Sequence, residues 1–244
     1  MTNNSKSIVD CITATLRDEI LRGQYRPGER LPSERDLASR FEASRGAIRE
    51  VLKKLEELGI ASINPGGVRV VPIEEASLSI LGPLLVLNEW PDVTLVRHLL
   101  EVMGSLMSMS ARTAIERASD DEISQIQLIV QRMIATDDPK QNRENWKELA
   151  TLFAKINDNL VLRLIFNGLK TQFPERKDDP DFELAVDQQQ RIKNLKLFEL
   201  SLRKRDSKGA ADAISSDFLL AIEAVERTFN SPPFETRTAR QETR

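Results

Sequence analysis

Apolar residues recur at helical spacing between Leu37 and Leu58 and predict two short helices there. Ser33 and Ser44 each precede one of these helices, and serine is a preferred N-cap because its hydroxyl accepts a hydrogen bond from a free backbone N–H group. Asp36, three residues after Ser33, fits the acidic position of a capping box. We therefore expect one helix to begin near Ser33 and a second to begin at Ser44 and end before Gly59.

The second of these helices has two faces. Arg45 and Arg49 share one face, since they are four residues apart. The apolar positions on the other face are Ile48, Val51, Leu52, Leu55 and Leu58. Two short helices joined by a turn, with cations near the start of the second, are typical of a helix-turn-helix that places its second helix in the major groove of DNA. The alternative is that both arginines are solvated and paired with Glu42, Glu50 or Glu56.

A hairpin is predicted directly after these helices. The runs 60–63 and 68–71 are rich in β-forming residues, and the turn between them contains Gly66 and Gly67. These glycines permit close approach to a sugar-phosphate backbone, and Arg69 adds a cation. The hairpin is then the wing of a winged helix. The alternative is a hairpin that only completes the core of a small domain.

Segments 25–38 and 44–60 resemble the N-terminal domain of GntR-family bacterial transcription regulators, and the resemblance runs from about Ser7 to Val71. It implies a winged helix-turn-helix with three helices and a hairpin wing, in which Arg35, Arg45 and Arg49 contact operator DNA. The full set of expected nucleic-acid-binding residues is Arg35, Ser44, Arg45, Gly46, Arg49, Gly66, Gly67 and Arg69.

Beyond residue 76 the strand-like pattern disappears and helical spacing takes over, which predicts a mainly α protein whose second part is an all-α bundle of about seven helices. The expected helices are Ser77–Asn88, Val93–Glu116, Asp120–Ala135, Arg143–Asn157, Leu160–Phe173, Phe182–Lys204 and Ser207–Thr228. We accordingly expect a DNA-binding domain at 1–72, a linker at 73–76, an effector-binding and dimerisation domain at 77–230, and a disordered tail at 231–244.

Charge is unevenly divided along the 244 residues, whose net charge is −3. Residues 1–72 hold 12 basic and 10 acidic side chains, a net +2, and residues 73–244 hold 23 and 28, a net −5. Because this net positive charge is small, we expect affinity for DNA to come from a few precisely positioned arginines and from the use of two copies of the domain. The small charge argues against an architectural protein that coats any DNA.

Other features bound the class and location of the protein. The chain has one cysteine, Cys11, and its polar start does not look like a signal peptide, so a cytoplasmic location is expected. The longest apolar run is far shorter than the roughly 20 residues of a membrane helix, so no membrane partner is expected. No phosphate loop, nucleophile elbow or His/Asp pair is present, so the protein is not expected to be an enzyme.

The second part of the chain resembles the FadR branch of the same family, on segments 158–169 and 195–206. That branch dimerises through a helical domain that holds an effector, and many members bind a divalent metal through one Asp and three His residues. The aligned positions here are Ala150, Ala154, Leu195 and Asp217, none of which is the expected ligand. His98 is the only histidine, so we expect no metal and no cofactor.

Loss of the metal ligands predicts a more apolar pocket, which suits an acyl-CoA or another lipid-derived effector. Segment 167–170 also resembles the acyl-CoA-responsive regulator of the branch, whereas Met103 replaces an arginine common there. The expected pocket residues are Met103, Ala150, Ala154, Asn167, Leu195 and Asp217. The sequence thus predicts a ligand-responsive repressor or activator that binds a pseudo-palindromic double-stranded DNA operator as a homodimer. The alternatives are a regulator of a small carboxylate and an architectural protein without effector.

Overall fold

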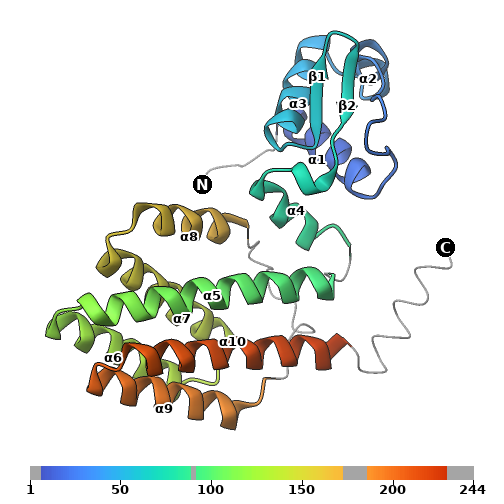
Figure 1. Cartoon of the computed structure of the whole chain (residues 1–244). Helices are drawn as coiled ribbons and strands as arrows, with labels where there is room; N and C mark the ends of the chain where they lie inside the picture. The colour runs from blue at the N-terminus through green and yellow to red at the C-terminus, as the bar shows by residue number, and fades with distance from the viewer. Residues whose placement is uncertain (1–6, 89–91, 173–185, 230–244) are drawn as a thin grey trace. The chain divides into compact units, whose positions relative to one another are not determined.

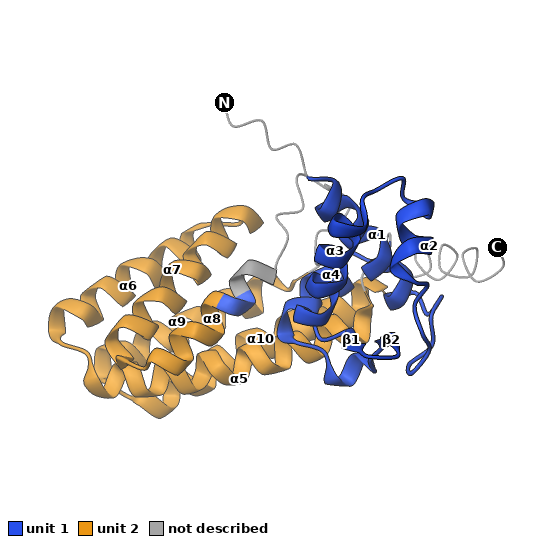
Figure 2. Cartoon of the chain, turned by 90° about the horizontal axis from the view of Figure 1, so that it is seen from above, with its two compact units in different colours: residues 1–91, 168–174 blue, residues 92–167, 175–244 orange. Residues whose placement is uncertain are grey.

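The computed structural model describes residues 7–88, 92–172 and 186–229, and it confirms the mainly α class. The chain divides into two compact units (Figure 2). Unit 1 comprises Met1–Pro91 with Gly168–Pro174, and unit 2 comprises Asp92–Asn167 with Glu175–Arg244. The tail predicted to be disordered, 231–244, lies outside the described residues.

Three helices form the body of unit 1: α1 (Ile8–Leu21), α2 (Glu34–Arg40) and α3 (Arg45–Glu57). Both predicted caps are present, because Ser33 Oγ accepts from the Asp36 N–H at 3.3 Å and Ser44 Oγ accepts from the Ala47 N–H at 3.1 Å. Gly59 follows α3 in the left-handed region, with φ 75°, as the sequence indicates. The three helices bury one apolar core whose fully covered members include Leu16, Leu37, Ile48, Val51 and Leu55.

The hairpin consists of β1 (Ala61–Asn64) and β2 (Gly67–Val70), which pair antiparallel from Ala61–Val70 to Asn64–Gly67 (Figure 1). A third extended segment, 28–31, covers the other edge of β2. Gly28 N–H donates to Val70 O at 2.8 Å, and Leu31 N–H donates to Val68 O at 2.9 Å. The loop that leads into α2 is therefore hydrogen-bonded along the wing.

The segment after the wing stays with unit 1. The predicted linker 73–76 contains the 3-10 helix η1 (Ile73–Glu75), and the predicted helix Ser77–Asn88 is only η2 (Leu78–Ile80) followed by α4 (Leu81–Leu85). Ile80 is buried in the core of unit 1, and Ser77 N–H donates to Leu58 O at 3.0 Å. The division between units accordingly falls after Pro91, because these contacts hold residues 76–85 against the winged helix.

Unit 2 contains α5 (Val93–Arg117), α6 (Asp120–Ala135), α7 (Pro139–Asn157), α9 (Gln188–Lys204), α10 (Ser207–Phe229) and most of α8 (Leu160–Gln172). The long helices α5 and α10 lie side by side (Figure 1), and Phe218 of α10 approaches Gly104 so closely that a Cβ there would lie 2.8 Å from the Phe218 Cβ. Residues from α5, α6, α7, α9 and α10 form the buried core. No described helix is both long and apolar enough to cross a bilayer.

Most of the predicted helices of this unit are confirmed, and the differences lie at their starts. Helix α7 begins at Pro139, earlier than the predicted Arg143, because Asp138 caps it and proline suits the first helical turn. Helix α9 begins at Gln188, after the cap Asp187. The predicted start of that helix at Phe182 and the predicted end of the preceding one at Phe173 lie outside the described residues.

Candidate functional site

The start of α3 presents the arginines that the sequence singles out. Arg45 is the first helical residue and Arg49 follows one turn later, and both side chains are exposed. The opposite side of the helix is sealed, since Ile48, Val51 and Leu55 are completely buried. The helix therefore projects guanidinium groups on one side and packs on the other, as the amphipathic pattern predicts.

The partners of these arginines differ from the expected ones. Arg49 Nε donates to Glu34 Oε2 at 2.8 Å, and Glu34 is the first residue of α2. Arg35 lies 3.6 Å from Asp36 Oδ1, and its side chain is 79% exposed. Within the described part of the chain, Arg45 has no carboxylate partner. The expected pairs with Glu42, Glu50 and Glu56 are therefore wrong, because Glu34 reaches across from the preceding helix.

Arg40 has a structural role. Its guanidinium makes two hydrogen bonds to the Glu19 carboxylate, one of them at 3.0 Å, and it lies over the Phe41 ring. Glu19 is buried, and the bond to it raises the pKa of Arg40. This pair joins α1 to α2 and so fixes the first half of the helix-turn-helix.

The wing tip adds an arginine that the sequence reasoning missed. Gly67 has φ 112°, and a Cβ there would lie 2.8 Å from the Arg30 Cζ, so the exposed Arg30 guanidinium lies directly against this glycine. Arg69 Nη1 donates to Gly28 O at 2.8 Å, while Gly66 is exposed. Arg30 is 37 residues before Gly67 in the chain, and only the pairing of segment 28–31 with β2 brings them together.

Most of the expected pocket residues in unit 2 belong to its packed core or its surface. Leu195 is part of the core, Ala150 packs against that core, and Ala154 is buried. Met103 is half-buried on α5, and Asn167 is exposed on α8. The sixth expected residue, Asp217, belongs to a polar region.

A buried polar cluster lies in the same bundle, and we define it as Asn142 and Asn145 of α7, Arg191 and Asn194 of α9, and Asp217 of α10. Arg191 and Asn194 are only 4% and 3% exposed. Burial raises the pKa of Asp217 to about 6, although Arg191 and a hydrogen bond from Asn194 act in the opposite direction. This part of the bundle is therefore polar, unlike the apolar pocket that the sequence predicts.

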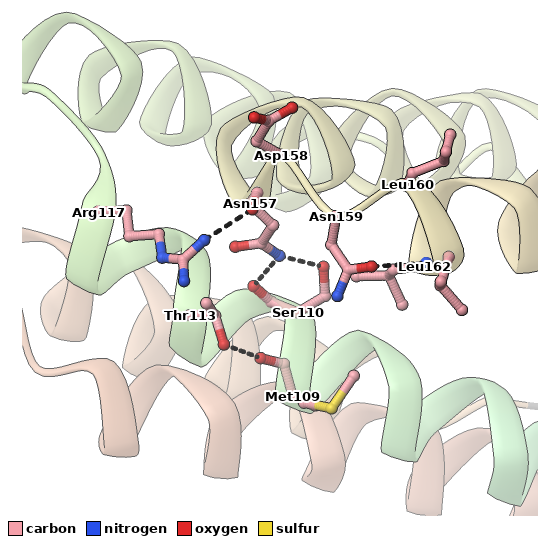
Figure 3. A pocket seen from close by; sticks show the side chains of 10 residues that line it. Met109, Ser110, Thr113, Arg117, Asn157, Asp158, Asn159, Leu160 and Leu162 are labelled. Atoms are coloured by element: carbon pink, nitrogen blue, oxygen red, sulfur yellow. Dashed lines mark hydrogen bonds between the residues drawn. The ribbon is translucent and has the colours of Figure 1, made fainter.

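A pocket of about 350 Å³ lies at the connection between α7 and α8, beside α5 (Figure 3). Asn157 Nδ2 donates to Ser110 Oγ at 2.9 Å, and Arg117 Nη1 donates to Asn157 O at 2.7 Å. Apolar side chains of Met109, Leu160 and Val161, all more than half exposed, also line it. None of its residues was expected from the sequence to bind a ligand.

Comparison with known proteins now identifies the two units. Residues 9–71 match the gntR family of bacterial regulatory proteins, and residues 98–218 match the FCD domain. The chain belongs to the gntR family. Members of the gntR family are DNA-binding transcriptional regulators and not enzymes, and the FCD domain is their FadR-like effector-binding domain.

Two curated members illustrate the relationship. The chain is 28% identical to the HTH-type transcriptional regulator Mce2R of Mycobacterium tuberculosis over 174 residues, which is 69% of this chain and 71% of the relative. It is 33% identical to the galactonate operon transcriptional repressor of Escherichia coli over 141 residues, which is 57% of this chain and 60% of that relative. Among solved structures the fold resembles that of Lar, which controls the expression of the agr system of Listeria monocytogenes. The TM-score is 0.54 at 17% sequence identity, and the match covers 92% of this chain and 99% of that chain.

Within this gntR-family fold, Asp217 is the one member of the buried polar cluster that the sequence predicts in the effector pocket. The other four members were not expected there, although a signal was present. Arg191 and Asn194 lie on the same helical stripe as Leu195, Phe198 and Leu202, which is a position that helical spacing assigns to the core. Polar side chains on such a stripe indicate a buried polar site. Among the described residues, no group of three or more His, Cys, Asp or Glu side chains could hold a metal ion.

Proposed function

We propose that this gntR-family regulator binds a pseudo-palindromic operator as a homodimer, and that a small molecule bound to the FCD domain changes its affinity for DNA. The observation that carries the proposal is the exposed side of α3, where Arg45 and Arg49 project from a helix whose other side is sealed. In winged helices this helix enters the major groove, where an arginine can bond a guanine at two points.

Each expected residue has a role in this interface. Arg45 and Arg49 read base edges, and Arg35 contacts a phosphate. Ser44 caps α3, and Gly46 permits close approach of the backbone to DNA. A Cβ at Gly46 would meet only Ser44 Oγ, at 3.8 Å, so nothing inside the described protein requires a glycine there.

The wing supplies a second set of contacts to the sugar-phosphate backbone. Gly66 and Gly67 allow the tip to approach the backbone, and Arg69 adds a cation whose direction is set by Gly28 O. The small net charge of +2 on residues 1–72 supports the use of few placed arginines in two copies, rather than architectural coating of DNA.

Homodimerisation is supported by apolar side chains on the surface of unit 2. Leu160, Val161 and Leu164 of α8 are between 60% and 66% exposed. A contiguous exposed apolar surface of this kind marks an interface, and a second copy with two-fold symmetry covers it. The two winged helices of the dimer then match the two-fold symmetry of the operator. A DNA partner also implies a cytoplasmic location.

For the effector, a small carboxylate has more support than an acyl-CoA. The buried polar cluster holds a buried guanidinium and three buried or half-buried carboxamides, which suit a polar ligand and not an acyl chain. The relative that represses the galactonate operon is named for a hydroxylated carboxylate.

Selection of binding sites from random DNA, followed by footprinting of the selected site, tests the DNA-binding part. We expect two protected half-sites about one helical turn apart, and a loss of about 1–3 kcal/mol on this site for Arg45→Ala or Arg49→Ala. Arg112→Ala, which removes an exposed arginine of α5, is the control. Equal affinity for selected and random DNA would refute sequence-specific binding.

A further inference from the structure

Some buried polar atoms of unit 2 have no hydrogen-bond partner among the described residues, and four of them belong to the buried polar cluster. They are Asn142 Oδ1 and Asn145 Nδ2 on α7, Arg191 Nη1 on α9, and Asp217 Oδ1 on α10. Buried polar atoms in folded proteins are almost always paired with protein, water or a ligand. The four atoms therefore require partners that the described residues do not supply.

Two contacts locate these side chains in one region of the bundle. Arg191 Nη2 donates to Thr136 O at 2.6 Å, and Thr136 lies two residues before Asp138, the residue that caps α7. The guanidinium is therefore at the start of α7, where Asn142 and Asn145 occupy the first two turns and, three residues apart, share a face.

The third helix reaches the same region through a ring contact. Trp146 and Phe218 lie edge to face with centroids 5.4 Å apart, and each is adjacent in sequence to a member of the cluster, Asn145 or Asp217. Asp217 also interacts with Arg191 and Asn194 of α9. Helices α7, α9 and α10 therefore all contribute polar atoms to one site.

The charge of Arg191 points to the chemistry of the missing partner. Its bonded nitrogens donate to neutral oxygens, Gln188 Oε1 at 2.9 Å and Thr136 O. Among the described residues the Asp217 carboxylate is attracted to the guanidinium, but no carboxylate is hydrogen-bonded to it. A guanidinium that is only 4% exposed is stable when it meets an anion. The free atoms are two donors, on Arg191 and Asn145, and two acceptors, on Asn142 and Asp217.

We propose that the buried polar cluster binds a small carboxylic acid that carries a hydroxyl or amino group next to its carboxylate. The ligand carboxylate accepts hydrogen bonds from Arg191 Nη1 and Asn145 Nδ2. A neighbouring hydroxyl donates its single proton to one of the two acceptors, Asp217 Oδ1 or Asn142 Oδ1, whereas a neighbouring ammonium donates to both. This assignment rests on the proposed function, because it names the effector class and the effector site of the FCD domain.

Thermal unfolding of the full chain tests the ligand class. D-glycerate, D-galactonate and L-serine carry both groups, propionate lacks the donor, glycerol lacks the carboxylate, and octanoyl-CoA represents the lipid-derived alternative. We expect at least one of the first three to raise Tm by about 3 °C or more at ten times its Kd. We expect propionate, glycerol and octanoyl-CoA at the same concentrations to give no comparable rise.

Variants assign the effect to the cluster. Arg191→Gln abolishes the rise in Tm, and Asn145→Leu, a substitution of similar size, weakens ligand binding at least tenfold without touching the guanidinium. Asp217→Asn distinguishes the two donors, because it keeps the response to D-glycerate or D-galactonate and loses the response to L-serine. Arg112→Ala on the surface of α5 retains the full response.

The inference is overturned if none of the three acids raises Tm, if Arg191→Gln and Asn145→Leu retain the rise, or if only octanoyl-CoA stabilises the chain. Ordered water then supplies the partners of the four atoms. No DNA is present in these measurements. Failure here with an intact footprint refutes the ligand class alone, whereas absence of a footprint refutes the proposed function.

Discussion

The carboxylate of Glu34 at the start of α2 accepts a 2.8 Å hydrogen bond from Nε of Arg49, one turn into α3. The two helices of the helix-turn-helix are thereby joined through a side chain that is also expected to read DNA. Arg49 is still 65% exposed, so its remaining nitrogens are available to a base or a phosphate. Glu34 fixes the direction of the guanidinium and adds a negative charge near the DNA.

Glu34→Gln removes that charge and the ion pair. We expect affinity for scrambled DNA to rise, because phosphate repulsion is lost, and discrimination between operator and scrambled DNA to fall by about 1 kcal/mol. Fluorescence anisotropy with both DNAs at a fixed salt concentration measures the ratio. A ratio equal to that of the wild type would mean that Glu34 does not orient Arg49.

Arg30→Ala tests the wing. Its guanidinium lies against Gly67 at the tip of the hairpin, so its loss should weaken binding to operator and scrambled DNA alike. We expect the slope of log K against log salt concentration to become shallower by about one. Arg112→Ala should leave the slope unchanged. A full slope in Arg30→Ala would place this arginine outside the interface.

The sequence predicts most of the fold because each helix carries its own caps and apolar stripe. Ser33, Ser44 and Gly59 mark the helix-turn-helix through local hydrogen bonds and a local φ, and periodicity alone locates most of unit 2. The prediction of one helix over residues 77–88 is wrong because Ile80 packs into the core of unit 1, whose other residues are distant in sequence. The local pattern of apolar residues does not reveal this contact.

The same contrast between local pattern and long-range contact decides which residues of the candidate site can be predicted. Arg45 and Arg49 follow from helical spacing, whereas Arg30 and Glu34 acquire their positions through contacts with residues distant in sequence. Helical spacing assigns Arg191 to the core side of its helix, but only the arrangement of α7, α9 and α10 determines which polar groups surround it.

Arg40→Ala tests the structural arginine of unit 1. Removal of its guanidinium leaves the Glu19 carboxylate, whose residue is 9% exposed, without its partner. We expect unfolding of unit 1 to become easier by about 2 kcal/mol. Arg45→Ala, an exposed position, should change stability by no more than about 0.5 kcal/mol. Chemical denaturation followed by circular dichroism compares the two, and equal stabilities would show that the pair contributes little.

Asp217→Asn tests the pH dependence of unit 2 without ligand. The folded pKa of about 6 lies above the ordinary 3.8, so ionisation of Asp217 destabilises the fold. The stability contributed by this group is fully present below pH 4 and is lost as pH rises through 6. Asp217→Asn should therefore be more stable than the wild type at pH 7.5, by about 2–3 kcal/mol.

Chemical denaturation at two pH values tests whether ionisation of Asp217 destabilises the fold. The advantage of Asp217→Asn should be about 1 kcal/mol smaller at pH 5 than at pH 7.5, because part of the wild-type penalty is absent at the lower pH. Asp212→Asn, an exposed position on α10, should show no such trend. A less stable Asp217→Asn at both pH values would mean that attraction to Arg191 outweighs desolvation.

The strand-like segment 28–31 fixes the loop that leads into α2 to the hairpin of the DNA-binding unit. Since Gly28 and Leu31 are bonded to β2, the chain that enters α2 cannot swing away from the hairpin without breaking three backbone hydrogen bonds. The loop that leads into α2 and the wing are thus held together by these hydrogen bonds. We expect ligand binding elsewhere in the chain to leave these hydrogen bonds intact.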